Sequence, residues 1–193
     1  GSMGICVREV VKALPIQEGD VVITNHPAFG GSHLPDITLI KGVFVKGKLI
    51  GYVAARAHPA EIGGKKPGSM PADATTLNEE GVIIPPTYLV RQGKAQWAYI
   101  KEILSTGIYP SRLPEENLAD LNGALAAVNV GETKLQSLCE AYGLIEVSNY
   151  MKALRSYASN LLRSKLKSVK QKSFAAKERL DDGSILNVNI KIL

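Results

Sequence analysis

Residues 37–58 have the sequence ITLIKGVFVKGKLIGYVAARAH, and this stretch decides the fold. Two runs rich in branched and aromatic residues, 37–45 and 49–57, flank a Lys-Gly-Lys segment at 46–48. That arrangement predicts a β-hairpin. Both runs are almost continuously apolar, so we expect both strands to be largely buried.

The segments around the hairpin predict an α+β fold with strands first, helices after them and a hairpin at the end. We expect a helix over 5–13, a strand over 21–25, and helices over 97–106, from Pro114, from Gly131 to about Tyr142, and from Val147 to about Val169. Proline and glycine are dense between 59 and 93, which predicts a long ordered loop. The tail alternates around Asp181, Asp182 and Gly183, which predicts a second hairpin over 174–192.

Composition excludes several classes of protein. The chain has 193 residues, 45% of them hydrophobic and 21% charged, which is typical of a folded domain and not of a disordered one. It has no apolar run long enough to cross a bilayer, so we expect no membrane association. Cys6 and Cys139 form no CxxC motif, which favours free thiols in a reducing cytoplasm.

The net charge of +5 is mild, and its surplus lies late in the chain. Positively charged residues recur there within a helical pattern, and one aromatic residue, Tyr157, lies nearby. They are Arg155, Arg163, Lys165, Lys167, Lys170 and Lys172. Nucleic-acid binding needs a concentrated basic patch with aromatic residues beside it. We therefore interpret these residues as a solvated helix face and expect no nucleic-acid partner.

The candidate ligands of a metal ion surround the hairpin. His33 and Asp36 are three residues apart and Pro35 prevents a normal helix between them, so we expect a turn that enters a strand. His58 follows the second strand. A loop centred near Gly47 pairs position 58 with position 36, which brings the three side chains together.

Two imidazoles and one carboxylate suit a divalent transition ion such as Mn, Fe or Zn, with open positions for water or substrate. The alternative is that these histidines are hydrogen-bonded structural residues, and spacing alone leaves it open. Two other kinds of site are disfavoured. The segment GGKKPGS at 63–69 does not match a phosphate-binding loop, and no GxSxG serine-hydrolase elbow is present.

The ordered motifs of the chain resemble the hydantoinase B/oxoprolinase family from about residue 19 to the C-terminus. The matching segments are GDVVITN at 19–25, GGSHLPD at 30–36, ARAH at 55–58, IGG at 62–64, PGSM at 67–70, EG at 80–81, IPP at 84–86, NLADL at 117–121, YG at 142–143 and LDDG at 180–183. Family subunits are much longer, so the resemblance implies one partial domain over 4–193. It would comprise a β-rich metal-site part (4–93), a helical part (94–170) and the start of a β segment (171–193).

The resemblance implies one component of a two-component enzyme of the N-methylhydantoinase and 5-oxoprolinase type, with acetone carboxylases as relatives. A hydantoinase A-like subunit would bind ATP and activate the substrate, and this component would hold a divalent metal. In the carboxylase relatives a His-x-x-Asp motif and the histidine of the Ala-Arg-Ala-His segment hold that metal. His33, Asp36 and His58 occupy those positions.

Departures from the family pattern occur near these residues. His26 stands where the family commonly has Asp, and it could be a substitute ligand or a structural residue. Glu61 stands where Asp is common, and Pro59 where a second histidine is common.

Together these features predict a cytoplasmic metal-binding component of an ATP-dependent cyclic-amide hydrolase, acting on a small molecule and working as an oligomer. The alternatives are a non-catalytic structural or interaction module of the same fold, or a fragment of a ketone carboxylase-like subunit.

Overall fold

The computed structural model describes residues 3–192, which form two compact units divided between Leu144 and Ile145. Helices and antiparallel sheets make up both, so the prediction of an α+β fold is confirmed. No helix among residues 3–192 has the length and apolar character needed to span a membrane.

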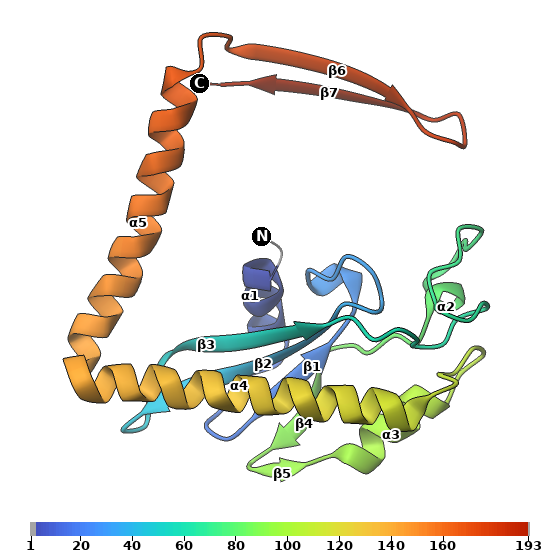
Figure 1. Ribbon diagram of the computed structural model, residues 1–193, viewed down its shortest axis with the longest axis horizontal. Helices are drawn as coiled ribbons and strands as arrows, with labels where there is room; N and C mark the ends of the chain where they lie inside the picture. The colour runs from blue at the N-terminus through green and yellow to red at the C-terminus, as the bar shows by residue number, and fades with distance from the viewer. Residues whose placement is uncertain (1–2, 193) are drawn as a thin grey trace. The chain divides into compact units, whose positions relative to one another are not determined.

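The first unit is built on an antiparallel sheet (Figure 1). Within the described residues it has five strands in the order β3-β2-β1-β4-β5. Their bounds are β1 Val21–Thr24, β2 Ile37–Val45, β3 Lys48–Ala57, β4 Thr87–Arg91 and β5 Lys94–Ala95. β2 is mostly buried, as expected, but β3 is only half-buried, because it forms an edge of the sheet.

The predicted hairpin is β2 paired with β3, and its turn is tighter than expected. Lys46 and Gly47 both have positive φ, 51° and 73°, which is the two-residue turn that matches strand twist. A shift in register next to the turn leaves Ile50 as an extra residue in β3. This bulge restores the expected pairing at the far end, where Ile37 lies opposite Ala57.

The two faces of the sheet carry different cores. α4 (Pro114–Tyr142) runs across β2 and β3 on one face, as Figure 1 shows. With α3 (Trp97–Ser105) it covers a cluster that includes Ile23, Leu39 and Leu121. The other face packs against α1 (Met3–Ala13); its buried residues are Cys6, Val10, Ile16, Val22 and Ile40. Strand residues alternate between these faces, which is why β1 and β2 read as almost continuously apolar.

Two sequence predictions need correction. The loop expected over 59–93 contains a short helix, α2 (Leu77–Glu80), and strand β4. The segment TYLVR has strand-forming residues, but two prolines before it and a glycine after it masked the signal. Helix α4 also runs unbroken through Gly131, where we expected a new segment to begin.

Gly131 is explained by close packing and not by a helix end. A Cβ at this position would lie 3.3 Å from the Val53 side chain on β3, so glycine lets the helix approach the sheet. In the second unit, α5 (Leu144–Ser168) and a hairpin of β6 (Ser173–Arg179) with β7 (Ile185–Lys191) agree with the predicted helix and tail hairpin.

The second hairpin is amphipathic, and neither of its faces is packed within its own unit. Its register places Phe174 opposite Ile190 and Ala176 opposite Val188, which makes one apolar face. Every residue of both strands is nevertheless exposed. An isolated two-stranded sheet in water is marginally stable at best.

Substitution of Gly131→Leu should lower the free energy of unfolding by about 1–3 kcal/mol, because the new side chain must displace Val53 or shift α4. Gly123→Leu in the same helix is the matched control, since its Cβ would meet nothing within 4 Å. It should be neutral or slightly stabilising through helix propensity. Chemical denaturation of both variants measures the difference, and equal effects would contradict this account of Gly131.

Candidate metal centre

The turn before β2 presents two of the predicted ligands on the same side. The backbone N–H of Asp36 donates to the carbonyl of His33 at 3.0 Å, which closes a β-turn over Leu34 and Pro35. Leu34 is fully buried and anchors this turn in the protein. The first and last residues of such a turn lie close together, as the His-x-x-Asp spacing predicted.

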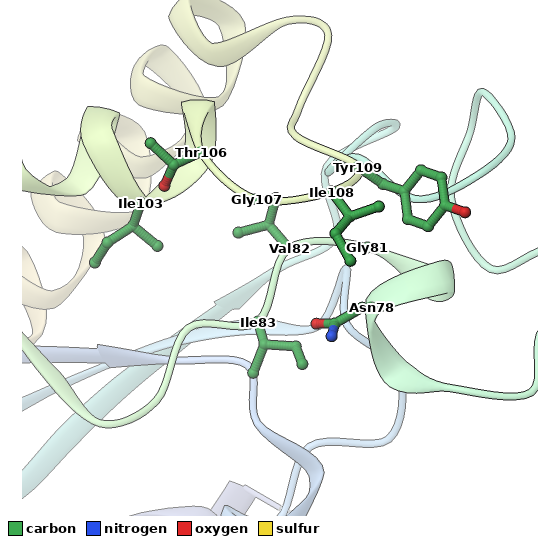
Figure 2. Close-up of a pocket in the computed structure, with 9 residues that line it drawn as sticks. All are labelled: Asn78, Gly81, Val82, Ile83, Ile103, Thr106, Gly107, Ile108 and Tyr109. Carbon is green, nitrogen blue, oxygen red and sulfur yellow. The ribbon is translucent and has the colours of Figure 1, made fainter.

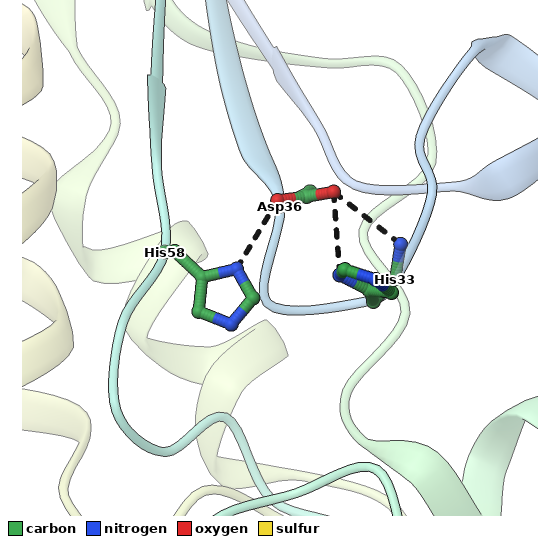
Figure 3. A group of neighbouring side chains, drawn as sticks. All are labelled: His33, Asp36 and His58. Atoms are coloured by element: carbon green, nitrogen blue, oxygen red, sulfur yellow. Dashed lines mark hydrogen bonds and ion pairs between the residues drawn. The ribbon is translucent and has the colours of Figure 1, made fainter.

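The β2–β3 pairing brings the third residue to the same place. His58 directly follows β3, and its Nδ1 lies 3.1 Å from Oδ1 of Asp36. Nδ1 of His33 lies 3.5 Å from Oδ2 of the same carboxylate. Figure 3 shows the carboxylate between the two imidazoles, whose ring centroids are 5.6 Å apart. The structure therefore brings His33, Asp36 and His58 together.

Potential metal-ligand atoms of the three residues lie close together. One potential ligand atom from each residue lies within 4.8 Å of the others. In tetrahedral coordination with bonds of about 2.1 Å, ligand atoms lie about 3.4 Å apart, so the three side chains would have to close by about 1.4 Å around an ion. The imidazoles are half-exposed, at 52% for His33 and 49% for His58, while the Asp36 side chain is 15% exposed. Water or substrate can thus reach the open side.

The electrostatics of Asp36 favour its ionised form, which is the form that binds metal. Burial by itself raises the pKa of the Asp36 carboxyl. Hydrogen bonds from His58 and from the backbone N–H of His33 act in the opposite direction and outweigh it, so the pKa lies below its ordinary value.

His26 has a structural role here. Its Nδ1 accepts a hydrogen bond from the backbone N–H of Ala28 at 3.1 Å, and it caps the short turn η1 (Pro27–Phe29). This agrees with the structural alternative. The three-residue cluster does not include it.

A buried amide that the residue types alone did not single out supports the ligand turn. Asn25 donates through Nδ2 to the carbonyls of Leu34 and Val82, each at 2.8 Å, and its Oδ1 accepts from the backbone N–H of Ile84 at 2.7 Å. The Asn25 side chain thus connects the backbone of the ligand turn at Leu34 to the backbone of the segment at residues 82–84. An asparagine at the end of a buried β-branched run was the available signal.

Glu61 supports the loop that follows His58. Its Oε1 accepts from the backbone N–H of Gly63 at 2.6 Å and from the Arg112 guanidinium at 2.8 Å, and its Oε2 accepts from the backbone N–H of Arg112 at 2.9 Å. Burial raises the pKa of Glu61, but these hydrogen bonds lower it more, and the pKa lies below its ordinary 4.5. The carboxylate therefore connects the loop at residues 61–64 to the segment just before α4.

A pocket of about 250 Å³ is lined by residues of α2, of α3 and of the loops that follow them (Figure 2). Ile103 and Ile108 come from α3 and the loop after it, and Asn78 comes from α2. Its wall at Gly81 contacts Leu34, because a Cβ at Gly81 would lie 3.6 Å from the Leu34 Cβ. None of the three candidate ligands is among the residues that line it.

Comparison with known proteins identifies relatives over the whole chain. A family model described as hydantoinase B/oxoprolinase matches residues 1–193. The chain is 38% identical to 5-oxoprolinase 1 of Arabidopsis thaliana over 216 residues, covering 100% of this chain and 17% of that protein. It is 34% identical to caprolactamase subunit beta of Pseudomonas jessenii over 167 residues, covering 86% of this chain and 28% of that protein.

Solved structures also match this chain. The ATP-dependent caprolactamase of Pseudomonas jessenii matches with a TM-score of 0.84 at 30% identity, over 100% of this chain and 34% of that one. An acetone carboxylase matches with a TM-score of 0.78 at 15% identity, over 96% of this chain and 29% of that one, which shows a shared fold. This chain thus spans about a third or less of the length of these relatives.

Substitution of Glu61→Gln should lower the free energy of unfolding at pH 7 by about 2–3 kcal/mol, because hydrogen bonds to a buried carboxylate are lost. A lowered pKa stabilises the fold fully above the ordinary 4.5 and loses this effect as pH falls through the lowered value. The difference between wild type and variant should therefore shrink below pH 4.5.

Urea denaturation at a series of pH values measures this difference. Glu9→Gln is the control, since Glu9 makes only an exposed ion pair with Lys12 and should change stability by under about 1 kcal/mol. A penalty for Glu61→Gln that stays constant with pH would contradict the role given to the carboxylate.

Proposed function

Because the chain belongs to the hydantoinase B/oxoprolinase family, we propose that it is the metal-binding component of an ATP-dependent cyclic-amide hydrolase. The observation that carries the proposal is the convergence of His33, Asp36 and His58 on one point at the end of the β2–β3 hairpin. Two named relatives act in this class: 5-oxoprolinase and caprolactamase. The proposed substrate class is therefore a small cyclic amide.

The residues present suit a Mn, Fe or Zn ion, because one carboxylate and two imidazoles form a borderline ligand set. When bound, such an ion supplies Lewis-acid polarisation and a water of lowered pKa. The chain's own residues provide the rest. Asp36 is held ionised between two imidazoles, and the half-exposed histidines leave one side of the cluster open to a substrate.

ATP would enter through a partner. The relative called caprolactamase subunit beta is by its name one subunit of a larger enzyme. We therefore assign ATP binding and substrate activation to a hydantoinase A-like component, with this chain in the cytoplasm as part of an oligomer.

Alanine at His33, Asp36 and His58 together should abolish bound metal. Elemental analysis of protein purified after growth with Mn, Fe and Zn should find close to one ion per chain in the wild type and none in the triple variant. Unchanged metal content in the triple variant would overturn the assignment. With an A-type partner, ATP and 5-oxoproline or caprolactam, the wild type should support hydrolysis and the triple variant should not.

A specific observation also favours the second candidate, a non-catalytic interaction module. The apolar side chains of α5 face solvent in their unit: Tyr150 is 69% exposed, Leu154 69% and Tyr157 65%. These residues step by four and three along the helix, so they form one stripe. Exposed apolar surface of this extent is typical of protein–protein contact.

Leu154→Glu should abolish co-elution with the A-type component in size-exclusion chromatography, because it places a charge in the stripe. Lys152→Glu lies on the opposite side of α5 and should leave the complex intact. If the triple alanine variant forms the complex but the wild type supports no turnover, the interaction module is the correct reading. If Leu154→Glu co-elutes like the wild type, the stripe is not the contact surface.

A further inference from the structure

Arg56 lies near the end of β3, the strand that leads to the candidate ligand His58. It precedes His58 by two residues, and its cross-strand neighbour Thr38 follows Asp36 by two residues. Thr38 and Arg56 form a cross-strand pair, and the side chains of Asp36 and His58 meet just beyond the ends of the same two strands.

The Arg56 guanidinium joins the segments of all three candidate ligands. Its Nε donates to Oγ1 of Thr38 at 2.7 Å, which ties β3, the strand before His58, to β2, the strand after Asp36. Its Nη2 donates to the carbonyl of Gly30 at 3.2 Å, at the start of the loop that leads to His33.

The Gly30 end of this loop also lies against α1. Gly30 has a φ of 85°, and a Cβ there would lie 2.7 Å from the backbone nitrogen of Cys6 in α1. A side chain at position 30 would therefore clash with α1, and glycine lets the loop lie close to that helix.

We infer that Arg56 is a positioning residue for the metal centre. Through its two hydrogen bonds, the guanidinium fixes the relative positions of the segments that carry His33, Asp36 and His58. The inference rests on the proposed function. Arginine suits this role because its planar group presents several donors in a fixed fork, whereas lysine offers one flexible point charge. Groups that orient metal ligands typically change metal affinity by about 10–100-fold when removed.

The positive charge of Arg56 should weaken metal binding, whereas its positioning role should strengthen it, so the two effects can be separated by experiment. A cation next to the cluster repels a bound cation, and Arg56 is close enough to contribute to the lowered pKa of Asp36. If repulsion dominates, removal of the charge strengthens metal binding. If positioning dominates, removal of the guanidinium weakens it.

The test is a titration of the full chain with Mn²⁺, with free ion measured by electron paramagnetic resonance. Arg56→Met keeps most of the side-chain bulk and should raise the Kd about 10–100-fold. Arg56→Lys keeps the charge but not the fork and should recover only part of this loss. Lys48→Met, at the opposite end of β3, is the control and should bind like the wild type.

Each outcome decides a separate point. A wild type that binds no Mn²⁺ in the titration and carries no Mn, Fe or Zn by elemental analysis overturns the proposed function. A wild type that binds, with Arg56→Met binding as tightly or more tightly, overturns only the role of Arg56. Should Arg56→Met fail to fold, Thr38→Val removes one acceptor without a change of charge. It should then weaken Mn²⁺ binding several-fold, and unchanged binding by a folded Thr38→Val would overturn the inference.

Discussion

The register between β2 and β3 is the constraint on which the candidate site depends. A shift of one residue would turn every side chain of β3 to the other face of the sheet. His58 and Arg56 would then leave Asp36 and Thr38, and residues of the core would face the ligand turn. The bulge at Ile50 sets this register, since the tight turn at Lys46 and Gly47 alone would pair the strands one residue out of step.

Buried polar side chains hold the segments that have no regular structure. Asn25 satisfies three backbone groups around the ligand turn, and Glu61 satisfies backbone and side-chain donors between the loop and α4. Such groups are costly to bury unless they are fully bonded, and no described buried side-chain nitrogen or oxygen lacks a partner. The ligand loops can therefore be ordered without strands of their own.

The two units differ in how they use their apolar residues. α4 buries Leu121 and Val128 against the sheet of the first unit, so that unit has a core of its own. α5 and the β6–β7 hairpin carry comparable apolar side chains at exposed positions. These exposed side chains are the surface that the proposed interaction module would use.

The sequence by itself determined the main hairpin, the tail hairpin, most helices and the three candidate ligands. These features depend on local patterns: strand runs around a glycine turn, a proline between His33 and Asp36, and helical periodicity. The family motifs pointed to the same residues. Only the tertiary structure decided that β4 pairs with β1, that α4 continues through Gly131, and that Asn25, Glu61 and Arg56 brace the ligand segments. These depend on partners distant in the chain, and no local pattern encodes which distant group a side chain meets.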